Sequence, residues 1–277
     1  MSLTHSGQTV RRSRIFRHSA FVRVTHWINV ICLTGLLMSG LQIFNAHPYL
    51  YWGKDSHFDT PIVAVTTDAE GQKGITRIFG AEFDTTGWLG LTAGSDGAFT
   101  DRGFPSWITL PGPHDLATGR RWHFFFAWIF VLNGVAYLLS GFFSGHFRRD
   151  LLPGRKQLRH IGRSIVDHLL LRFPKGEEAR QYNVLQKLSY LLVIFLLLPL
   201  IILAGWTMSP ALNAAFPQLL DLFGGRQSAR TIHFIVALAL VLFVFIHVAM
   251  VLLSGFWNNL RSMIIGRYDV EPTSGAS

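Results

Sequence analysis

Four of the twelve histidines lie inside long apolar segments, where ionisable side chains are rare and mark candidate functional sites. They are His26, His123, His233 and His247. His233 and His247 are 14 residues apart, almost four helical turns, so both rings are expected on one helix face, about 21 Å apart. Two neutral imidazoles that face each other across a helical interior can hold a haem iron from above and below.

The segments that carry these histidines are long enough to cross a membrane. Four stretches contain no Asp, Glu, Lys or Arg, and each exceeds the roughly 20 apolar residues that a membrane-spanning helix needs. They are residues 24–53, 122–147, 188–220 and 231–260. The sequence therefore predicts an all-α membrane protein, a four-transmembrane-helix bundle, rather than a soluble bundle with four buried helices. The predicted helices are 21–44, 121–143, 184–208 with a bend at Pro199, and 229–256.

The positive charge is unevenly distributed. Most of the 25 Lys and Arg lie in residues 11–23, 148–187 and 261–267. By the positive-inside rule these segments and both termini are expected to be cytoplasmic. The net charge of +9 is then a topology signal, and no nucleic-acid-binding pattern accompanies it. The single cysteine and the lack of a Cys-x-x-Cys-His motif exclude a disulfide, a c-type haem and an iron–sulfur cluster held by this chain alone.

The expected organisation is a four-helix domain with one long insertion. Residues 1–20 form a basic cytoplasmic tail, 21–268 the four-helix domain, and 269–277 a C-terminal tail. The periplasmic insertion, residues 47–119, is far longer than a helix–helix connection needs, and such loops are usually functional. Within the insertion, residues 61–67 alternate weakly like a strand. Outside it, in the basic segment after the second helix, a short surface helix is expected at 155–173. The insertion is predicted to be a folded cap that docks a periplasmic partner, the alternative being a flexible segment.

Depth in the membrane pairs the histidines. His123 and His233 meet in the periplasmic half, and His26 and His247 meet in the cytoplasmic half. We therefore expect two b-type haems, each between one pair. The alternatives are one haem or none, with the histidines as hydrogen-bonding contacts between helices, or another metal. Zinc would need three or four clustered ligands, and a proton transporter would need acidic partners, neither of which the four segments supply.

Arginines near the helix ends are candidates for binding the haem propionates. Arg23, with Arg17, is available to the inner haem, and Arg121, with Arg120, Arg226 and Arg230, to the outer haem. Anchoring of helix ends at the membrane surface is the alternative role. Glycines in the helices would either admit a porphyrin or tighten helix packing. They are Gly35, Gly40, Gly134, Gly141 and Gly205.

On these residues the chain resembles a known family. Arg23-Val-Thr-His26-Trp27 opens the first predicted helix, His123 opens the second, and His233 and His247 follow at 14-residue spacing. Over about residues 17–268 the chain is similar to bacterial di-haem cytochrome b subunits of NiFe-hydrogenases, formate dehydrogenase N and thiosulfate reductase. The stretch from Leu37 through Gly53 looks closest to the thiosulfate-reductase-like branch.

The resemblance implies bis-histidine b haems and electron exchange between the quinone pool and a periplasmic catalytic partner, here expected to be a molybdenum-cofactor oxidoreductase. It also implies a quinone site at Asn183 and Gln186, because residues 182–187 match a Tyr-Asn-x-x-Gln-Lys segment in formate dehydrogenase N's cytochrome. Leu185 stands where that relative has glycine. Helix capping is the alternative role of these polar residues. A self-sufficient membrane oxidoreductase, acting on superoxide or ferric iron at the outer haem, is the alternative function.

Overall fold

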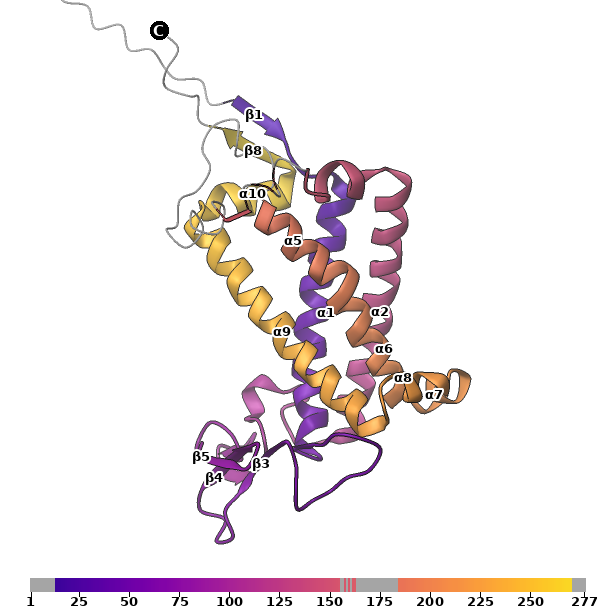
Figure 1. Ribbon diagram of the computed structural model, residues 1–277. Helices are drawn as coiled ribbons and strands as arrows, with labels where there is room; N and C mark the ends of the chain where they lie inside the picture. The colour runs from indigo at the N-terminus through magenta and orange to yellow at the C-terminus, as the bar shows by residue number, and fades with distance from the viewer. Residues whose placement is uncertain (1–12, 155–156, 158, 160, 163–183, 271–277) are drawn as a thin grey trace, which may run out of the picture. The chain divides into compact units, whose positions relative to one another are not determined.

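The computed structural model describes residues 13–154, 157, 159, 161–162 and 184–270 (Figure 1). By their contacts these residues fall into two compact units. The terminal unit comprises the described parts of residues 1–26, 137–193 and 243–277, and the insertion unit comprises 27–136 and 194–242. Each of the four long apolar segments contributes residues to both units.

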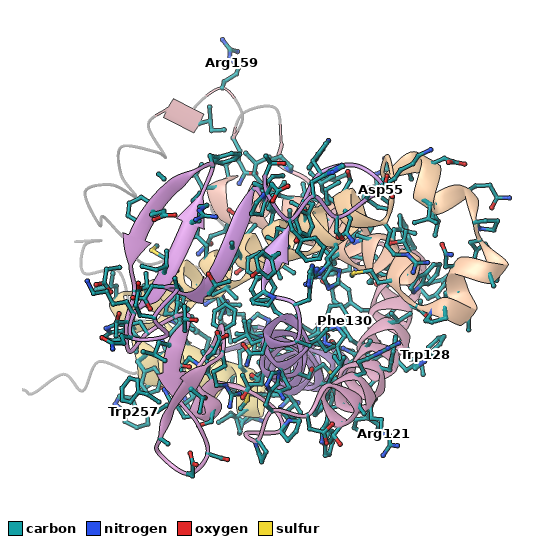
Figure 2. The ribbon with its side chains drawn as sticks, turned by 90° about the horizontal axis from the view of Figure 1, so that it is seen from below. Asp55, Arg121, Trp128, Phe130, Arg159 and Trp257 are labelled. Atoms are coloured by element: carbon teal, nitrogen blue, oxygen red, sulfur yellow. The ribbon has the colours of Figure 1, made fainter. Side chains whose placement is uncertain are left out.

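Four helical segments are long and apolar enough to cross a membrane, as predicted. They are α1 (Ala20–Asn45), α2 (Leu116–Phe143), the continuous stretch Val184–Met208, and α9 (Arg226–Leu253). Their outward-facing side chains are apolar. On α2, Trp128 is 53% exposed and projects away from the helix in Figure 2, whereas Phe130 is 5% exposed. Apolar side chains on the outside of such helices match a lipid surrounding, which offers no hydrogen bonds.

The third spanning segment has a widened turn just before a proline. It consists of α5 (Val184–Leu192), the π-helical turn η4 (Val193–Leu197) and α6 (Leu198–Met208). Pro199 has no amide hydrogen, and its ring would clash with the carbonyl four residues earlier in a regular helix. The wider turn relieves that clash. The distortion predicted at Pro199 is therefore present on its N-terminal side.

In the terminal unit the two ends of the described chain pair as strands. α9 ends at Leu253, before the expected Phe256, because Gly255 adopts a φ of 108° and turns the chain into α10 (Phe256–Ile265). β8 (Arg267–Val270) then pairs antiparallel with β1 (Ser13–Phe16), beside it in Figure 1. The guanidinium of Arg17 lies 4.6 Å from the Tyr268 ring centre. The predicted N-terminal tail thus pairs, in a two-stranded ribbon, with the end of the predicted four-helix domain and the start of the predicted C-terminal tail.

The insertion contains β-structure, so the prediction of an all-α protein is wrong in this segment. β2 (Tyr49–Leu50), β3 (Val63–Thr67), β4 (Gly74–Ile78) and β5 (Ala81–Asp84) form an antiparallel sheet in that order. β6 (Leu91–Ala93) and β7 (Phe99–Asp101) form a separate hairpin, and the 3-10 turn η1 (Ser106–Ile108) follows. The strand expected at 61–67 is β3. β4 has five residues like β3 but was not predicted, and the remaining strands have four or fewer, too few to show alternation.

A buried arginine fixes the insertion to the end of α1. Arg102 is 4% exposed and donates to the carbonyls of Phe104 and Gly112 at 2.8 and 3.1 Å. It also donates to the Gln42 side-chain oxygen at 3.2 Å and to Thr109 Oγ1 at 3.0 Å. The insertion is therefore a folded element attached to the helices.

Two further connections complete the described chain. The π-helical turn η2 (Phe147–Leu151) follows α2. α7 (Pro210–Ala215) and α8 (Gln218–Leu222) link α6 to α9. Most of the surface helix expected at 155–173 lies outside the described residues.

Candidate functional site

In the insertion unit, the structure brings together His123 of α2 and His233 of α9. Their ring centres are 6.2 Å apart and the ring planes are inclined at 62°. His123 Nδ1 lies 3.1 Å from the hydroxyl of Ser39 on α1. That hydroxyl donates its hydrogen to the Gly35 carbonyl at 2.6 Å, so it accepts from His123 Nδ1–H.

His233 is oriented in the same way by a backbone group. Its Nδ1 lies 2.8 Å from the carbonyl oxygen of Ile201 on α6, and a carbonyl can only accept, so Nδ1 carries the proton. In both rings Nε2 then keeps a free lone pair. Hydrogen bonding of one ring nitrogen fixes the tautomer that leaves the other nitrogen to bind a metal.

In the terminal unit, the structure brings together His26 of α1 and His247 of α9. Their ring centres are 6.4 Å apart and the planes are inclined at 54°. Phe243, one turn before His247, stacks on it with 5.9 Å between ring centres and 19° between the planes. Tyr190 of α5 contacts Phe243 edge-on at 6.4 Å. Aromatic side chains from α5 and α9 therefore support the His247 ring.

The spacing within both pairs fits axial coordination of a haem iron. With an iron–nitrogen bond of about 2.0 Å and a ring centre about 1.1 Å behind each nitrogen, the ring centres of two axial histidines are roughly 6.2 Å apart. The observed separations are 6.2 and 6.4 Å. Among the described residues no three His, Cys, Asp or Glu gather into a cluster that could hold a metal ion. The donor set thus suits two-ligand axial binding and not a zinc cage.

The glycines named in the sequence divide into two groups by what faces them. A Cβ on Gly40 or Gly205 would lie 3.4 Å from His123 Cε1 or 3.2 Å from His233 Cε1, so these two glycines border the outer pair. Gly35 and Gly141 instead admit the rings of Phe126 and Phe147 and tighten packing. Within the described part of the chain, a Cβ built on Gly134 would meet no atom within 4 Å apart from its own helix.

The arginines predicted to bind propionates differ in their surroundings. Arg23 donates through Nη1 to the Ile264 carbonyl, while its buried Nε has no hydrogen-bond partner among the described residues. Arg121 is exposed and projects away from α2 in Figure 2. Arg230 is half-buried, donates to the His47 carbonyl, and lies one turn before His233. Arg230 is therefore better placed than Arg121 to lie beside the His123–His233 pair.

Of the predicted quinone-binding residues, only one is described. Asn183 lies outside the described residues. Gln186 is half-buried on the first turn of α5. Its neighbour Lys187 is 7% exposed, and its ammonium lies 3.5 Å from the Leu152 carbonyl. This end of α5 therefore presents buried polar groups in the terminal unit.

Two histidines just outside the spanning helices remain neutral at neutral pH. Burial, followed by the positive charge of Arg17, lowers the pKa of His18 to about 4. Burial, followed by Arg230, also lowers the pKa of His47. Desolvation disfavours the charged imidazolium in both cases.

Sequence reasoning did not identify the residues that orient the ligand candidates. Ser39 carried a signal, since it is a hydroxyl in an apolar helix, and such groups often bond across helices in membranes. No sequence signal could identify the Ile201 carbonyl, because every residue has a backbone carbonyl. Tyr51 and Arg102, both buried at the same end of the insertion unit, were also missed.

Comparison with known proteins gives two matches. A family model described as prokaryotic cytochrome b561 matches residues 17–266. A protein of Azospira oryzae, named "Putative protein-methionine-sulfoxide reductase subunit YedZ1", is 30% identical over 236 residues, which are 85% of this chain and 90% of that protein. No solved structure shows significant similarity to the chain.

Proposed function

The chain belongs to the prokaryotic cytochrome b561 family, and on that premise we propose that it is a two-haem electron carrier between the quinone pool and an oxidoreductase partner. His123 and His233 would hold one b-type haem, and His26 and His247 the other. Each haem, when bound, supplies a one-electron couple whose potential depends on its ligands and surroundings. The observation that carries the proposal is the pair of ring separations, 6.2 and 6.4 Å.

The chain's own groups prepare the ligands for this role. The Ser39 hydroxyl and the Ile201 carbonyl accept from Nδ1 of His123 and His233, and keep each ring neutral with Nε2 available. Such outer hydrogen bonds also raise the basicity of the ligand. The apolar helices exclude water, so the site does not need to reorganise solvent when charge moves.

The charge asymmetry supports an orientation of the chain in the membrane. With the basic segments cytoplasmic, the His26–His247 pair would face the cytoplasmic side and the insertion the periplasm. A quinone carbonyl would accept a hydrogen bond from the Gln186 amide at the start of the third spanning segment, and Asn183, which lies outside the described residues, is the second residue predicted to bind it. The free Nε of Arg23 would bind a propionate of the inner haem.

The similarity to a reductase subunit supports a separate catalytic partner. We place that partner on the insertion and expect it to be a molybdenum-cofactor oxidoreductase. Two of the insertion's tryptophans, Trp88 and Trp107, are 78% and 74% exposed. Exposed aromatic side chains are enriched at protein interfaces. A membrane enzyme that acts alone would retain full activity without any co-purifying protein.

Single histidine substitutions test the assignment. We expect His123→Ala and His26→Ala each to lower the haem content from two to one per chain, measured by pyridine haemochrome on protein purified in detergent. The haem lost should differ between the two variants in its reduced spectrum or midpoint potential. His114→Ala, which changes an exposed histidine of the insertion, is the matched control and should keep both haems. Retention of two haems in either ligand variant would contradict the pairing.

A further inference from the structure

Tyr51 has a buried hydroxyl that the described chain does not satisfy. The residue is 1% exposed, and its hydroxyl has no hydrogen-bond partner in the described part of the chain. Its backbone is held, because Thr231 Oγ1 donates to the Tyr51 carbonyl at 2.6 Å. Buried hydroxyls are nearly always hydrogen-bonded, since leaving one unpaired costs free energy. The Tyr51 hydroxyl therefore indicates an acceptor that the described residues do not supply.

The ring of Tyr51 is fixed as firmly as its backbone. It packs against the rings of His47 and Phe58, with centres 5.7 and 6.0 Å away, and lies parallel to Tyr49 at 6.3 Å. Burial, followed by Tyr49, raises the pKa of Tyr51, although Arg230 opposes the rise. The hydroxyl therefore remains protonated at neutral pH and acts as a donor.

A cation stands beside this donor. Arg230 precedes Thr231, the residue that holds Tyr51, and its guanidinium carbon lies 5.8 Å from the Phe44 ring centre. Its recorded hydrogen bond goes to a neutral group, the His47 carbonyl, and no carboxylate contacts it among the residues that the structure describes. A partly buried guanidinium normally has an anionic partner. The Tyr51 hydroxyl donor and the Arg230 cation together could therefore bind an anion that has oxygen acceptors.

The position of this site selects the anion. Arg230 lies three residues before His233 on α9, so it is one turn, about 4.5 Å along the axis, from that ligand candidate. We propose that the Tyr51 hydroxyl and the Arg230 guanidinium bind a propionate carboxylate of the haem held by His123 and His233. This assignment rests on the proposed function. It gives the outer haem one orientation, with that propionate toward the insertion, and it partly neutralises the carboxylate charge.

Neutralisation of a propionate favours the reduced, more electron-rich state of the haem, so loss of either group should lower its midpoint potential. We expect Tyr51→Phe to keep two haems per chain and lower one of the two midpoints in a potentiometric titration, leaving the other unchanged. The propionate bending band in the resonance Raman spectrum should shift as well. Tyr49→Phe, which removes a hydroxyl from the parallel neighbouring ring, is the matched control and should change neither readout.

Arg230 provides an independent second test. Arg230→Gln should lower the same midpoint more than Tyr51→Phe does, and Arg230→Lys, which keeps the charge, should recover part of the loss. Unchanged midpoints and propionate band in Tyr51→Phe, with both haems present, would overturn the inference. Unchanged midpoints and propionate band in Tyr51→Phe, together with less phospholipid co-purifying with that variant, would also overturn the inference. The site would then bind a lipid phosphate. A wild-type protein without haem would instead contradict the proposed function, so the two failures are distinct.

Discussion

In a neutral histidine Nε2 is free to bind haem iron when Nδ1 carries the proton, and the insertion unit shows how α-helices can impose that tautomer. His123 donates to a serine hydroxyl whose own hydrogen is already committed to Gly35. His233 donates to a backbone carbonyl of α6. The first of these contacts can be removed by mutation, whereas the second is a main-chain group. Ser39 is therefore the residue through which the orientation of a ligand candidate can be tested.

We predict that Ser39→Ala weakens binding of the outer haem roughly 10–100-fold, the effect typical of losing a ligand's outer hydrogen bond. The rate of haem transfer to an excess of apomyoglobin measures this loss, and only one of the two haems should become labile. Thr34→Ala is the matched control on the same helix, because among the described residues the Thr34 hydroxyl bonds to the Val30 carbonyl of its own helix, at 2.8 Å, and to no histidine. Equal haem retention in both variants would show that Ser39 does not support the ligand.

At this scale, depth in the membrane was enough to predict which histidines would meet. The periodicity of α9 placed His233 and His247 on one face, and helix direction matched each with His123 or His26. Partners of the rings were not predictable, because the direction of a hydroxyl or the exposure of a carbonyl depends on how neighbouring helices rotate. For the same reason Arg121 and Arg230 were equal candidates for binding a propionate from the sequence, whereas the structure shows Arg121 exposed and Arg230 half-buried.

The elements that position the site are helices whose ends are fixed by polar contacts. α2, which carries His123, starts five residues before the predicted Arg121, at Leu116. Asp115 precedes it and accepts a hydrogen bond from the Thr118 amide at 3.0 Å, as an N-cap residue does. The boundary prediction relied on the charge-free segment and so excluded Leu116 through Arg120, the first turn and the arginine that follows it.

The Asp115 cap gives a pH-dependent prediction. Its hydrogen bonds with the Thr118 side chain and then the Thr118 amide lower the pKa of Asp115. The stabilisation is therefore present above the carboxyl's unfolded pKa of about 3.9, and it is lost as the pH falls through the lower folded pKa. Thermal unfolding followed by circular dichroism should show a smaller loss of stability on acidification in Asp115→Asn than in the wild type. An identical acid dependence would contradict the cap.

The attachment of the insertion to α1 gives another prediction at this scale. Arg102→Ala leaves four acceptors without their donor and should reduce the insertion's stability by about 3 kcal/mol or more. Native-state proteolysis of the insertion measures this. Arg77→Ala, which breaks an exposed ion pair with Glu82 on the same sheet, should cost less than about 1 kcal/mol. Similar protease sensitivity in the two variants would contradict the anchoring role.

The strands explain where sequence reasoning about elements ended. β3 and β4 have five residues each and only β3 was predicted, whereas β6 and β7 have three residues each. β1 lies in the predicted N-terminal tail and β8 crosses the start of the predicted C-terminal tail, so their pairing is a long-range event. Four long apolar helices were predictable because each signal is local and about 20 residues long.

For the whole molecule, the membrane orientation is predicted from charge alone and can be measured directly. Alkaline phosphatase inserted after Asp96, in the exposed turn between β6 and β7, should be active because that turn is predicted to be periplasmic. The same enzyme fused after Ser277 should be inactive, and green fluorescent protein there should fluoresce. The reverse pattern would invert the proposed direction of both haem sites and of partner docking.

Family membership confirms the resemblance to bacterial cytochrome b membrane subunits. Neither match concerns thiosulfate reductase, so that finer placement stays a prediction, as do the quinone site and the molybdenum-cofactor partner. Co-purification of a periplasmic oxidoreductase with the wild type, and its loss when Trp88 and Trp107 are replaced by Ser, would support docking on the insertion. Undiminished co-purification with the double variant would place the interface elsewhere.

The central claim is that two histidine pairs in one chain hold two haems. A dithionite-reduced minus oxidised spectrum of the purified wild-type protein, combined with a pyridine haemochrome assay and quantitative amino-acid analysis, tests it most directly. The account predicts b-type spectra and two haems per chain. A protein that is folded, expressed with ample haem supply, and still contains no haem or only one would contradict it.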